Sequence, residues 1–270
     1  MDFAIKQVDT KPQYRYSICT LVTDVVEYGE MVESFLKAGF NEQECEFRYV
    51  DNTAANSFDA YQGLNLFLSD ARGEYIILCH QDILLQFDDI KVLEKRIAEI
   101  TELDKNWAVL GNAGGIENDL YQRFALSVAY GDGVHQQVGK LPQKAVSMDE
   151  NFIIVKRSAN LALSHDLQGF HFYGTDICLV AELLGYTAYV IDFRLLHKSY
   201  GNPDESYYEI LERLISKYVH FMRDRRILTT IADFYLSSSK WRTILADTKL
   251  GKKIARKIKK INARRLAKND

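Results

Sequence analysis

Short apolar runs alternate with amphipathic segments through the first 112 residues of the chain. Four runs rich in β-branched and aromatic residues predict strands, and they are Tyr16–Thr23, Cys45–Val50, Glu74–Cys79 and Trp107–Asn112. Between them, apolar residues recur at the i, i+3, i+4 spacing of helices, over residues 28–36, 60–71 and 90–100. Strands that alternate with helices predict right-handed crossovers and a mainly parallel sheet covered on both faces. The pattern therefore predicts an α/β fold.

The pattern changes in the second half of the chain. Glycines and short β-like pieces over residues 114–143 predict a small antiparallel excursion or a flexible lid. Strands resume at residues 151–157 and 186–192, with a short helix over 177–184 between them.

The chain has 270 residues, enough for one large domain or two small ones. Beyond Pro203 the pattern is helical to the end, with no glycine between Gly201 and Gly251. We therefore expect an α/β domain over residues 1–203 and a C-terminal helical extension over residues 204–270.

Composition narrows the class of protein. A hydrophobic content of 47% is ordinary for a folded soluble protein, and nowhere do 18 apolar residues run without a charge. The first ten residues, "MDFAIKQVDT", lack the basic and apolar regions of an export signal, so we expect a cytoplasmic protein. The four scattered cysteines form no CxxC pair, which argues against a zinc site or a disulfide framework.

Charge is distributed unevenly, although the net charge is only −3. Residues 249–270 hold ten Lys and Arg and one acid, giving +9 there and leaving −12 for the rest. An apolar stripe among these basic residues is typical of a helix lying on an anionic membrane, here the inner face of the plasma membrane. A solvated terminal helix fits the same pattern. A nucleic-acid partner is disfavoured because the segment has no aromatic residue to stack on bases.

Polar residues follow the first three predicted strands: Thr23 and Asp24, then Asp51 and Asn52, then His80, Gln81 and Asp82. Ligands of open parallel sheets bind outside the carboxyl ends of the strands. We therefore expect all three groups at one edge of the sheet, around one binding site.

Two of these residues have the chemistry of a metal site. His80 and Asp82 are two apart on an extended segment and would face a common space. A ring nitrogen and a carboxylate suit Mn²⁺ or Mg²⁺, and His197 after a later strand is a candidate third ligand. Each of them taken alone could equally be a surface or capping residue.

Five sequence blocks carry a family resemblance. They are "YRYSICTLVT", "FRYVDNT", "AYQGLNLFLSDARGEYIILCHQDILL", "SMDENFIIVKRS" and "GFHFYGTDICLVAELLGYTAYVIDFRLLHKSYG", in this order over residues 14–202. Their order and spacing resemble family 2 type glycosyltransferases with the GT-A fold. The resemblance implies a three-layer αβα sandwich with a mostly parallel mixed sheet. It also implies transfer of a sugar from a nucleoside diphosphate, UDP in the first place, to a hydroxyl of a glycan or lipid-linked acceptor in surface polysaccharide synthesis.

The resemblance also assigns roles to single positions. Asp51 resembles the acid that holds the uracil or ribose of the donor, and Asn65 the asparagine in the helix before the metal strand. His80-Gln81-Asp82 occupies the place of the DXD motif, and His197 matches a late histidine that can complete the metal site. The nucleotide-sugar-binding residues expected at this stage are Thr23, Asp24, Asp51, Asn52, Asn65 and Gln81.

The catalytic base is expected among two aspartates, because inverting enzymes of this kind use an Asp or Glu in that role. Asp176 is the first candidate, although it could instead cap the following helix. Asp149 is the second candidate and would lie near the donor sugar or acceptor. His171 and Tyr173 are expected to line the acceptor side or to be half-buried packing residues.

Two departures from the family pattern keep other functions open. His80 replaces the first Asp of the common motif, and Gly174 stands where many relatives carry an acid. A catalytically degenerate GT-A module that binds nucleotide sugars or acts as a membrane scaffold is therefore an alternative. A metallohydrolase that uses His80, Asp82 and His197 is a third.

Overall fold

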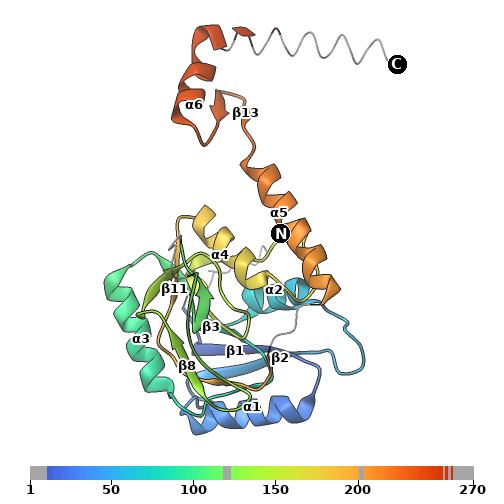
Figure 1. Cartoon of the computed structure of the whole chain (residues 1–270), viewed down its shortest axis with the longest axis vertical. Coiled ribbons are helices and arrows are strands. Elements are labelled where there is room, and N and C mark those ends of the chain that lie inside the picture. Colours follow the sequence, from blue (N-terminus) through green and yellow to red (C-terminus); the bar gives the residue numbers. More distant parts are fainter. Residues whose placement is uncertain (1–10, 118–122, 201–203, 252, 255–256, 258–270) are drawn as a thin grey trace, which may run out of the picture. The chain divides into compact units, whose positions relative to one another are not determined.

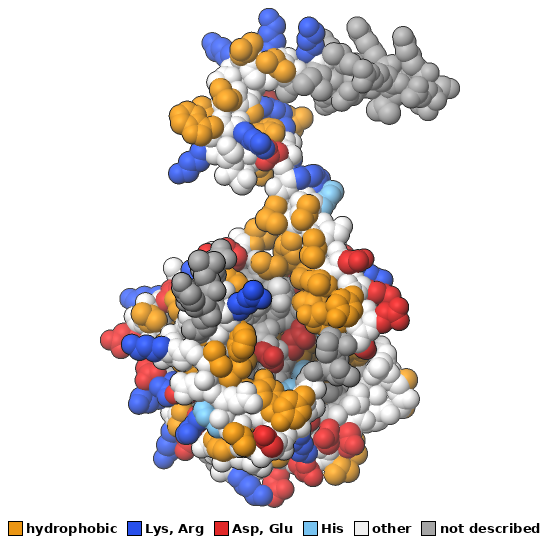
Figure 2. Space-filling model, in the orientation of Figure 1, with side chains coloured by type: hydrophobic (Ala, Val, Ile, Leu, Met, Phe, Trp, Pro, Cys, Tyr) orange, Lys and Arg blue, Asp and Glu red, His pale blue; other side chains and the backbone are white. Residues whose placement is uncertain are grey.

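The computed structural model describes residues 11–117, 123–200, 204–251, 253–254 and 257. The chain divides into two compact units, Met1–Leu211 and Glu212–Asp270 (Figure 1). The first unit has 17 Lys and Arg against 32 Asp and Glu, a net charge of −15, whereas the second has 17 against five, a net charge of +12. Figure 2 shows Lys and Arg side chains gathered over the second unit.

A seven-stranded sheet forms the centre of the first unit, in the order β2-β1-β3-β10-β5-β11-β9. Its strands are β1 (Tyr14–Val22), β2 (Cys45–Asp51), β3 (Gly73–Cys79), β5 (Trp107–Gly111), β9 (Gln143–Ala145), β10 (Phe152–Lys156) and β11 (Thr187–Val190). Five of them run in one direction, while β10 and β9 run antiparallel to their neighbours. The prediction of an α/β fold with a mostly parallel mixed sheet is confirmed.

Helices cover both faces of this sheet (Figure 1). They are α1 (Val25–Lys37), α2 (Ala60–Asp70), α3 (Ile90–Leu103) and α4 (Tyr173–Leu183), with a short 3₁₀ turn, η1 (Arg157–Ala159), after β10. Phe35 of α1 and Leu93 of α3 share one core cluster with Ile77 of β3. The next β3 residues on either side, Ile76 and Leu78, are buried outside that cluster, as expected for alternate side chains on opposite faces. The layers are therefore helix, sheet and helix.

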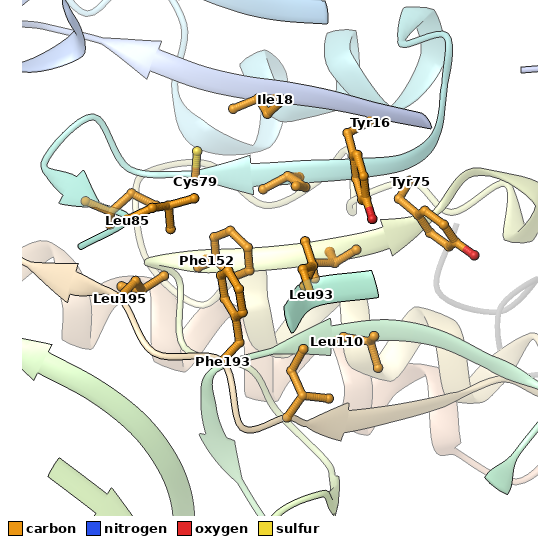
Figure 3. Close-up of a cluster of buried hydrophobic side chains, with 14 of the residues drawn as sticks. Tyr16, Ile18, Tyr75, Cys79, Leu85, Leu93, Leu110, Phe152, Phe193 and Leu195 are labelled. Atoms are coloured by element: carbon orange, nitrogen blue, oxygen red, sulfur yellow. The ribbon is translucent and has the colours of Figure 1, made fainter. Parts of the chain in front are cut away.

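Large aromatic side chains fill the core cluster (Figure 3). Trp107 is fully buried and stacks on Tyr75 with ring centroids 5.7 Å apart, and its Nε1 donates to Thr101 Oγ1 at 2.9 Å. Phe152 of β10 stacks on Phe193 at 5.4 Å. Burial of each such ring stabilises the fold by about 2–3 kcal/mol.

Aspartates start three of the helices in this unit. Asp24, Asp59 and Asp89 have extended backbones, and their side chains accept hydrogen bonds from amides in the first turns of α1, α2 and α3. Gly39 follows the end of α1 with φ +92°, a conformation that glycine adopts without strain.

A second, smaller sheet carries the strands of the predicted excursion. It consists of β4 (Ile83–Leu84), β12 (Leu196–His197), β7 (Phe124–Tyr130) and β6 (Ala113–Gly115), with β8 (His135–Val138) paired to β7. Strands β6, β7 and β8 pair antiparallel, so the antiparallel alternative is confirmed. Strand β12 lies beside β4, which follows β3 directly. This pairing brings two distant segments of the chain to one edge.

The helical prediction for the C-terminal region is wrong over residues 225–236. Helix α5 (Glu205–Met222) crosses from the first unit into the second, and α6 (Lys240–Asp247) lies near its end, but β13 (Arg225–Leu228) and β14 (Asp233–Leu236) form a hairpin between them. At the turn, the Ala232 amide donates to Thr229 Oγ1 at 2.7 Å. Arg226 forms an ion pair with Asp233 across the hairpin and another with Asp247 of α6. These contacts, not an apolar stripe, favour the strands.

Two further predictions concern the chain as a whole. Among the described residues, none of the helices combines the length and apolarity that crossing a bilayer requires. The four cysteines are free thiols buried in the structure. Of the basic segment 249–270, only residues 249–251, 253–254 and 257 are described, and the rest of the predicted membrane stripe lies outside the described residues.

Candidate functional site

Three side chains able to bind a metal ion meet at the carboxyl end of β3. His80 and Asp82 follow that strand, and His197 lies on β12 next to Ile83 in antiparallel register. His197 Nε2 is 3.3 Å from Asp82 Oδ1 and 3.4 Å from His80 Nδ1. His80 Nδ1 is 3.9 Å from the same carboxylate oxygen. Two imidazoles and a carboxylate at these distances fit a divalent ion such as Mn²⁺ or Mg²⁺.

The protonation states of this cluster suit a cation. Burial alone would raise the pKa of Asp82, but hydrogen bonds from His197 and Ser199 and electrostatic interaction with the histidines hold that pKa well below its usual range. Packing of the surrounding side chains and the neighbouring His197 lower the pKa of His80, although 41% of its side chain stays accessible to solvent. Near neutral pH the cluster therefore offers an ionised carboxylate and a neutral His80 imidazole, the forms that bind metals.

A second layer of polar groups holds the two imidazoles. Tyr173 Oη lies 3.0 Å from His80 Nε2 and donates to the backbone carbonyl of Glu150 at 3.0 Å. Burial raises the pKa of Tyr173 well above its ordinary value, so the hydroxyl keeps its proton. Ser199 Oγ lies 3.2 Å from His197 Nε2. Such partners orient the ring nitrogens of metal-binding histidines.

A pocket of about 370 Å³ lies beside the three ligands. It is lined by Leu21, Thr23, Glu27, Asn52, Ala60, Leu64, Leu78, Cys79, His80, Gln81, Asp82, Phe170, His171 and Tyr173. These residues come from the ends of β1 and β3 and the residues after them, the loop after β2, the first turns of α1 and α2, and the start of α4 with the segment before it. The site thus lies where ligands of open α/β sheets bind.

Gln81 ties the end of β3 to the start of α1. Its Oε1 accepts from the amides of Thr23 and Asp24 at 2.8 and 3.0 Å, and its Nε2 donates to Thr23 Oγ1 and to Glu27. Asp24 Oδ1 in turn accepts from the amides of Val26 and Glu27 as the helix cap. Thr23 and Gln81 line the pocket, whereas the Asp24 carboxylate is engaged with the helix.

Asn52 shapes the loop after β2. Its side-chain amide exchanges two hydrogen bonds with the backbone of Phe58, and the residue is buried in the pocket wall. Asp51 is exposed beside it, and its Oδ1 accepts from the amide and hydroxyl of Thr53, which lower the pKa of the carboxyl. The Asp51 carboxylate is therefore ionised and exposed at the start of the loop that follows β2.

Two predicted residues make structural contacts away from the pocket lining. The side-chain amide of Asn65 exchanges two hydrogen bonds with the backbone of Leu163, at 3.0 and 2.8 Å. Asp176 is fully buried, and its two oxygens accept from the amide and hydroxyl of Ser164 at 2.7 and 2.6 Å. The alternative that Asp176 caps α4 is wrong, since the helix begins after Phe172 and Asp176 lies within its first turn.

Asp149 has a different environment from Asp176. Asp149 is exposed, with Oδ1 accepting from the amide and side chain of Asn151 at 3.1 and 2.6 Å. Its negative charge opposes the lowering of the His80 pKa and contributes to the raised pKa of Tyr130. Of the two predicted bases, Asp149 is the one a substrate can reach from solvent.

Glu150 lies near the site and was not predicted from the sequence. It directly follows Asp149, and nothing in the pattern distinguishes the two neighbouring acids. Its Oε1 accepts from the Gly174 amide at 3.3 Å, and burial raises the pKa of its carboxyl to about 8. A side chain at position 174 would place its Cβ 2.2 Å from the Met148 carbonyl oxygen. Only glycine fits there, and the Glu150 carboxyl binds the amide of this glycine in the first turn of α4.

His171 lines the pocket and comes from the segment before α4. Its backbone carbonyl accepts from the Tyr61 hydroxyl at 3.0 Å, and its Nε2 is 3.8 Å from Asp204. Its ring packs against Tyr207 with centroids 5.5 Å apart. The side chain is therefore held partly by packing and partly by a polar partner.

A comparison with curated proteins identifies a relative. The protein "ATP synthase subunits region ORF 6" of Fuscovulum blasticum is 34% identical over 206 residues, which cover 75% of this chain and 83% of that protein. The chain belongs to the family of this protein. No family model matches the chain.

The chain is similar to solved structures, among them three of low sequence identity. "Mannosyltransferase PcManGT from Pyrobaculum calidifontis in complex with GDP-Man and Mn2+" is 13% identical, with a TM-score of 0.48, and the match covers 80% of this chain and 68% of that one. S. aureus TarS 1-349 is 16% identical, with a TM-score of 0.46 and 76% and 65% covered. A197 from STIV is 11% identical, with a TM-score of 0.39 and 71% and 87% covered.

Proposed function

We propose that the chain is a metal-dependent glycosyltransferase that moves a sugar from a nucleoside diphosphate, UDP in the first place, to a hydroxyl of a glycan or lipid-linked acceptor. The observation that carries the proposal is the cluster of His80, Asp82 and His197 beside a pocket at the carboxyl edge of the sheet. Surface glycan or polysaccharide synthesis is the process that would use such a reaction.

A diphosphate brings about two to three negative charges to a unit whose net charge is already −15. A divalent ion held by His80, Asp82 and His197 would compensate these charges and act as a Lewis acid on the departing diphosphate. Mn²⁺ suits the two imidazoles better than Mg²⁺ does. Thr23 and Asn52 in the pocket wall, with Asp51 beside them, are proposed to contact the nucleoside.

Asp149 is the proposed general base, in preference to Asp176. Its exposed carboxylate would take the proton of the acceptor hydroxyl as that oxygen forms the new bond to the sugar carbon. The bond from that carbon to the phosphate oxygen breaks, and its electron pair leaves with the diphosphate. Attack from the face opposite the leaving group gives inversion. The fully buried Asp176, bound twice by Ser164, is proposed to support the start of α4.

A thermal-shift panel of nucleoside diphosphates with and without Mn²⁺ tests the proposal. Because only ligands of the folded state raise the melting temperature, UDP with Mn²⁺ is expected to raise it by several degrees and UDP alone by less. Asp82→Asn should abolish the metal-dependent part, whereas Asp132→Asn, an exposed loop residue, should keep it. Failure of every nucleotide to stabilise the chain with Mn²⁺ or Mg²⁺ would contradict the proposal.

A binding module without transferase activity is the second candidate, because Asp176 is buried and Gly174 leaves no room for an acid. Hydrolysis of the donor in the presence of Mn²⁺ separates the two. A transferase should release nucleoside diphosphate slowly without an acceptor and faster with one, and Asp149→Asn should reduce the faster rate by about 10²-fold or more. Donor binding without turnover would favour the module.

A further inference from the structure

The hydrogen bonds around Tyr173 fix which nitrogen of His80 carries the proton. The Tyr173 hydroxyl has one proton, and a backbone carbonyl can only accept, so that proton goes to the Glu150 carbonyl oxygen at 3.0 Å. Toward His80 Nε2, also at 3.0 Å, the same oxygen can then only accept. Nε2 must therefore be the protonated nitrogen of the neutral ring.

Protonation at Nε2 leaves the other ring nitrogen of His80, Nδ1, without a proton. His80 Nδ1 is left with its lone pair, and this atom faces His197 Nε2 at 3.4 Å and Asp82 Oδ1 at 3.9 Å. We infer that Tyr173 is a positioning residue that sets the His80 tautomer for coordination through Nδ1. The inference rests on the proposed function only in assuming that the cluster takes a divalent ion. It gives Tyr173 a role beside the acceptor-side position expected from the sequence, which stays a prediction.

The tautomer can be measured without metal or substrate. In ¹⁵N-histidine protein free of metal, long-range proton–nitrogen correlations should show His80 protonated at Nε2, with the signal assigned by its loss in His80→Gln. Tyr173→Phe keeps the ring but removes the hydroxyl, and it should give a mixture of both tautomers. Tyr189→Phe removes a hydroxyl of β11 that donates to Asp104 at the end of α3, and it should leave the His80 signals unchanged.

Mn²⁺ affinity, measured by electron paramagnetic resonance, gives the second readout. Loss of a partner behind a metal-binding histidine weakens metal binding by about 10–100-fold, so Tyr173→Phe should show a loss in that range and Tyr189→Phe none. A His80 ring protonated at Nδ1 in the parent protein would overturn the inference, as would a Tyr173→Phe variant with parental tautomer and Mn²⁺ affinity. Neither measurement depends on sugar transfer, so the proposed function can fail while this inference holds.

A second, independent inference concerns exposed apolar side chains in the second unit. Four large apolar side chains of this unit are exposed: Ile231 at the hairpin turn is 98% exposed, and Trp241, Ile244 and Leu245 of α6 are 76%, 59% and 64% exposed. The three α6 residues follow the i, i+3, i+4 spacing and therefore share one face of the helix. These four residues are called the C-terminal apolar set below.

Basic residues accompany this set. The unit has a net charge of +12, and Lys240 and Arg242 are the sequence neighbours of Trp241. Exposed aliphatic and indole side chains among Lys and Arg match an anionic lipid surface, which accepts apolar groups below its headgroups and attracts cations above them. We infer that the C-terminal apolar set inserts into the headgroup region of an anionic bilayer. The described residues of the unit thus extend the membrane contact expected for residues 249–270.

Vesicle binding of the full chain tests this surface. Because Trp107 is already fully buried, a blue shift of tryptophan emission on adding vesicles that contain phosphatidylglycerol reports Trp241. Phosphatidylcholine vesicles should give little shift, and salt should reduce it. In co-sedimentation, Ile231→Ser with Trp241→Ala should lower partitioning about tenfold or more. Leu103→Ser in α3, whose parent side chain is also 64% exposed, should not lower it.

Two outcomes would overturn this inference. One is equal partitioning of the parent and the double variant onto phosphatidylglycerol vesicles. The other is absence of binding of the parent protein to phosphatidylglycerol vesicles, and gel shift and sedimentation then test RNA and a second copy of the chain as the occupant instead. Circular dichroism of the double variant confirms that it is folded. Since the set lies outside the candidate site, loss of nucleotide binding by Asp82→Asn leaves this result unaffected.

Discussion

The two units of the chain place their apolar residues in opposite ways. The first unit buries its large side chains in a continuous cluster around β3 and β10, whereas α6 of the second unit has no buried residue within its described bounds. Their charges are also opposite, −15 and +12. The difference indicates that the first unit is stabilised by its own core, while the second uses polar contacts such as those of Arg226 and leaves its apolar groups for another surface.

Replacement of the two tryptophans should show the largest difference in stability between the units. Trp107→Ala should lower the free energy of unfolding by about 3–5 kcal/mol, because it removes a fully buried ring that stacks on Tyr75. Trp241→Ala should change it by less than about 0.5 kcal/mol, since that ring is 76% exposed. Urea unfolding followed by far-ultraviolet circular dichroism measures both. Similar losses in the two variants would mean that the second unit has a core of its own.

Glu150 gives a pH-dependent test within the first unit. Its folded-state pKa of about 8 lies above the ordinary value of 4.5, so as pH rises the unfolded chain loses the proton first. Glu150 therefore makes folding less favourable with increasing pH between about 4.5 and 8, and its full contribution is present only at lower pH. Glu150→Gln should raise the free energy of unfolding near pH 9 by roughly 2 kcal/mol and change it little near pH 4. The measurement is urea unfolding at both pH values.

Glu102→Gln, at an exposed position of α3, is the matched control for this change. It should show no such difference between the two pH values. A Glu150→Gln variant with the same stability as the parent near pH 9 would show that the carboxyl is ionised there without cost.

Arg226 gives the smallest of the three effects and tests the second unit alone. Its guanidinium donates to Asp247 Oδ1 at 3.3 Å and to the Ala246 carbonyl at 2.6 Å, and it pairs with Asp233. Arg226→Ala should destabilise the hairpin and α6 by about 1–2 kcal/mol, seen as faster amide exchange there and not in β3. Arg242→Ala, which removes an exposed pair with Asp224, should cost less than about 0.5 kcal/mol. Equal exchange in the two variants would argue against polar anchoring by Arg226.

The sequence predicted local elements of the first unit well, because apolar periodicity reports directly which face of an element is buried. The strand expected at Cys45–Val50 is β2 (Cys45–Asp51), and the one expected at Glu74–Cys79 is β3 (Gly73–Cys79). Periodicity does not report partners or directions. It therefore did not show that β10 lies antiparallel between β3 and β5, which depends on contacts between distant segments.

Because periodicity does not report the partners of a segment, it predicted some residues of the candidate site and not the contacts of others. Strand ends brought Thr23, Asn52 and the residues after β3 to one pocket, as parallel strands require. The contacts that occupy Asp176 and Asn65 come from the segment around Ser164, whose position no periodic pattern reports. The hairpin of the second unit was missed because alternation in its short strands is too brief to outweigh the long helical pattern before it.

The three candidate metal ligands lie where the two sheets meet. His80 and Asp82 lie in the connection from β3 of the large sheet to β4 of the small sheet, while His197 belongs to the two-residue strand β12, which the small sheet holds between β4 and β7. An ion bound by all three would cross-link these sheets, and its binding energy would then count toward keeping them together. Removal of the ion with a chelator should consequently increase amide exchange first in the small sheet, above all in β12, which is the strand farthest along the chain from β3.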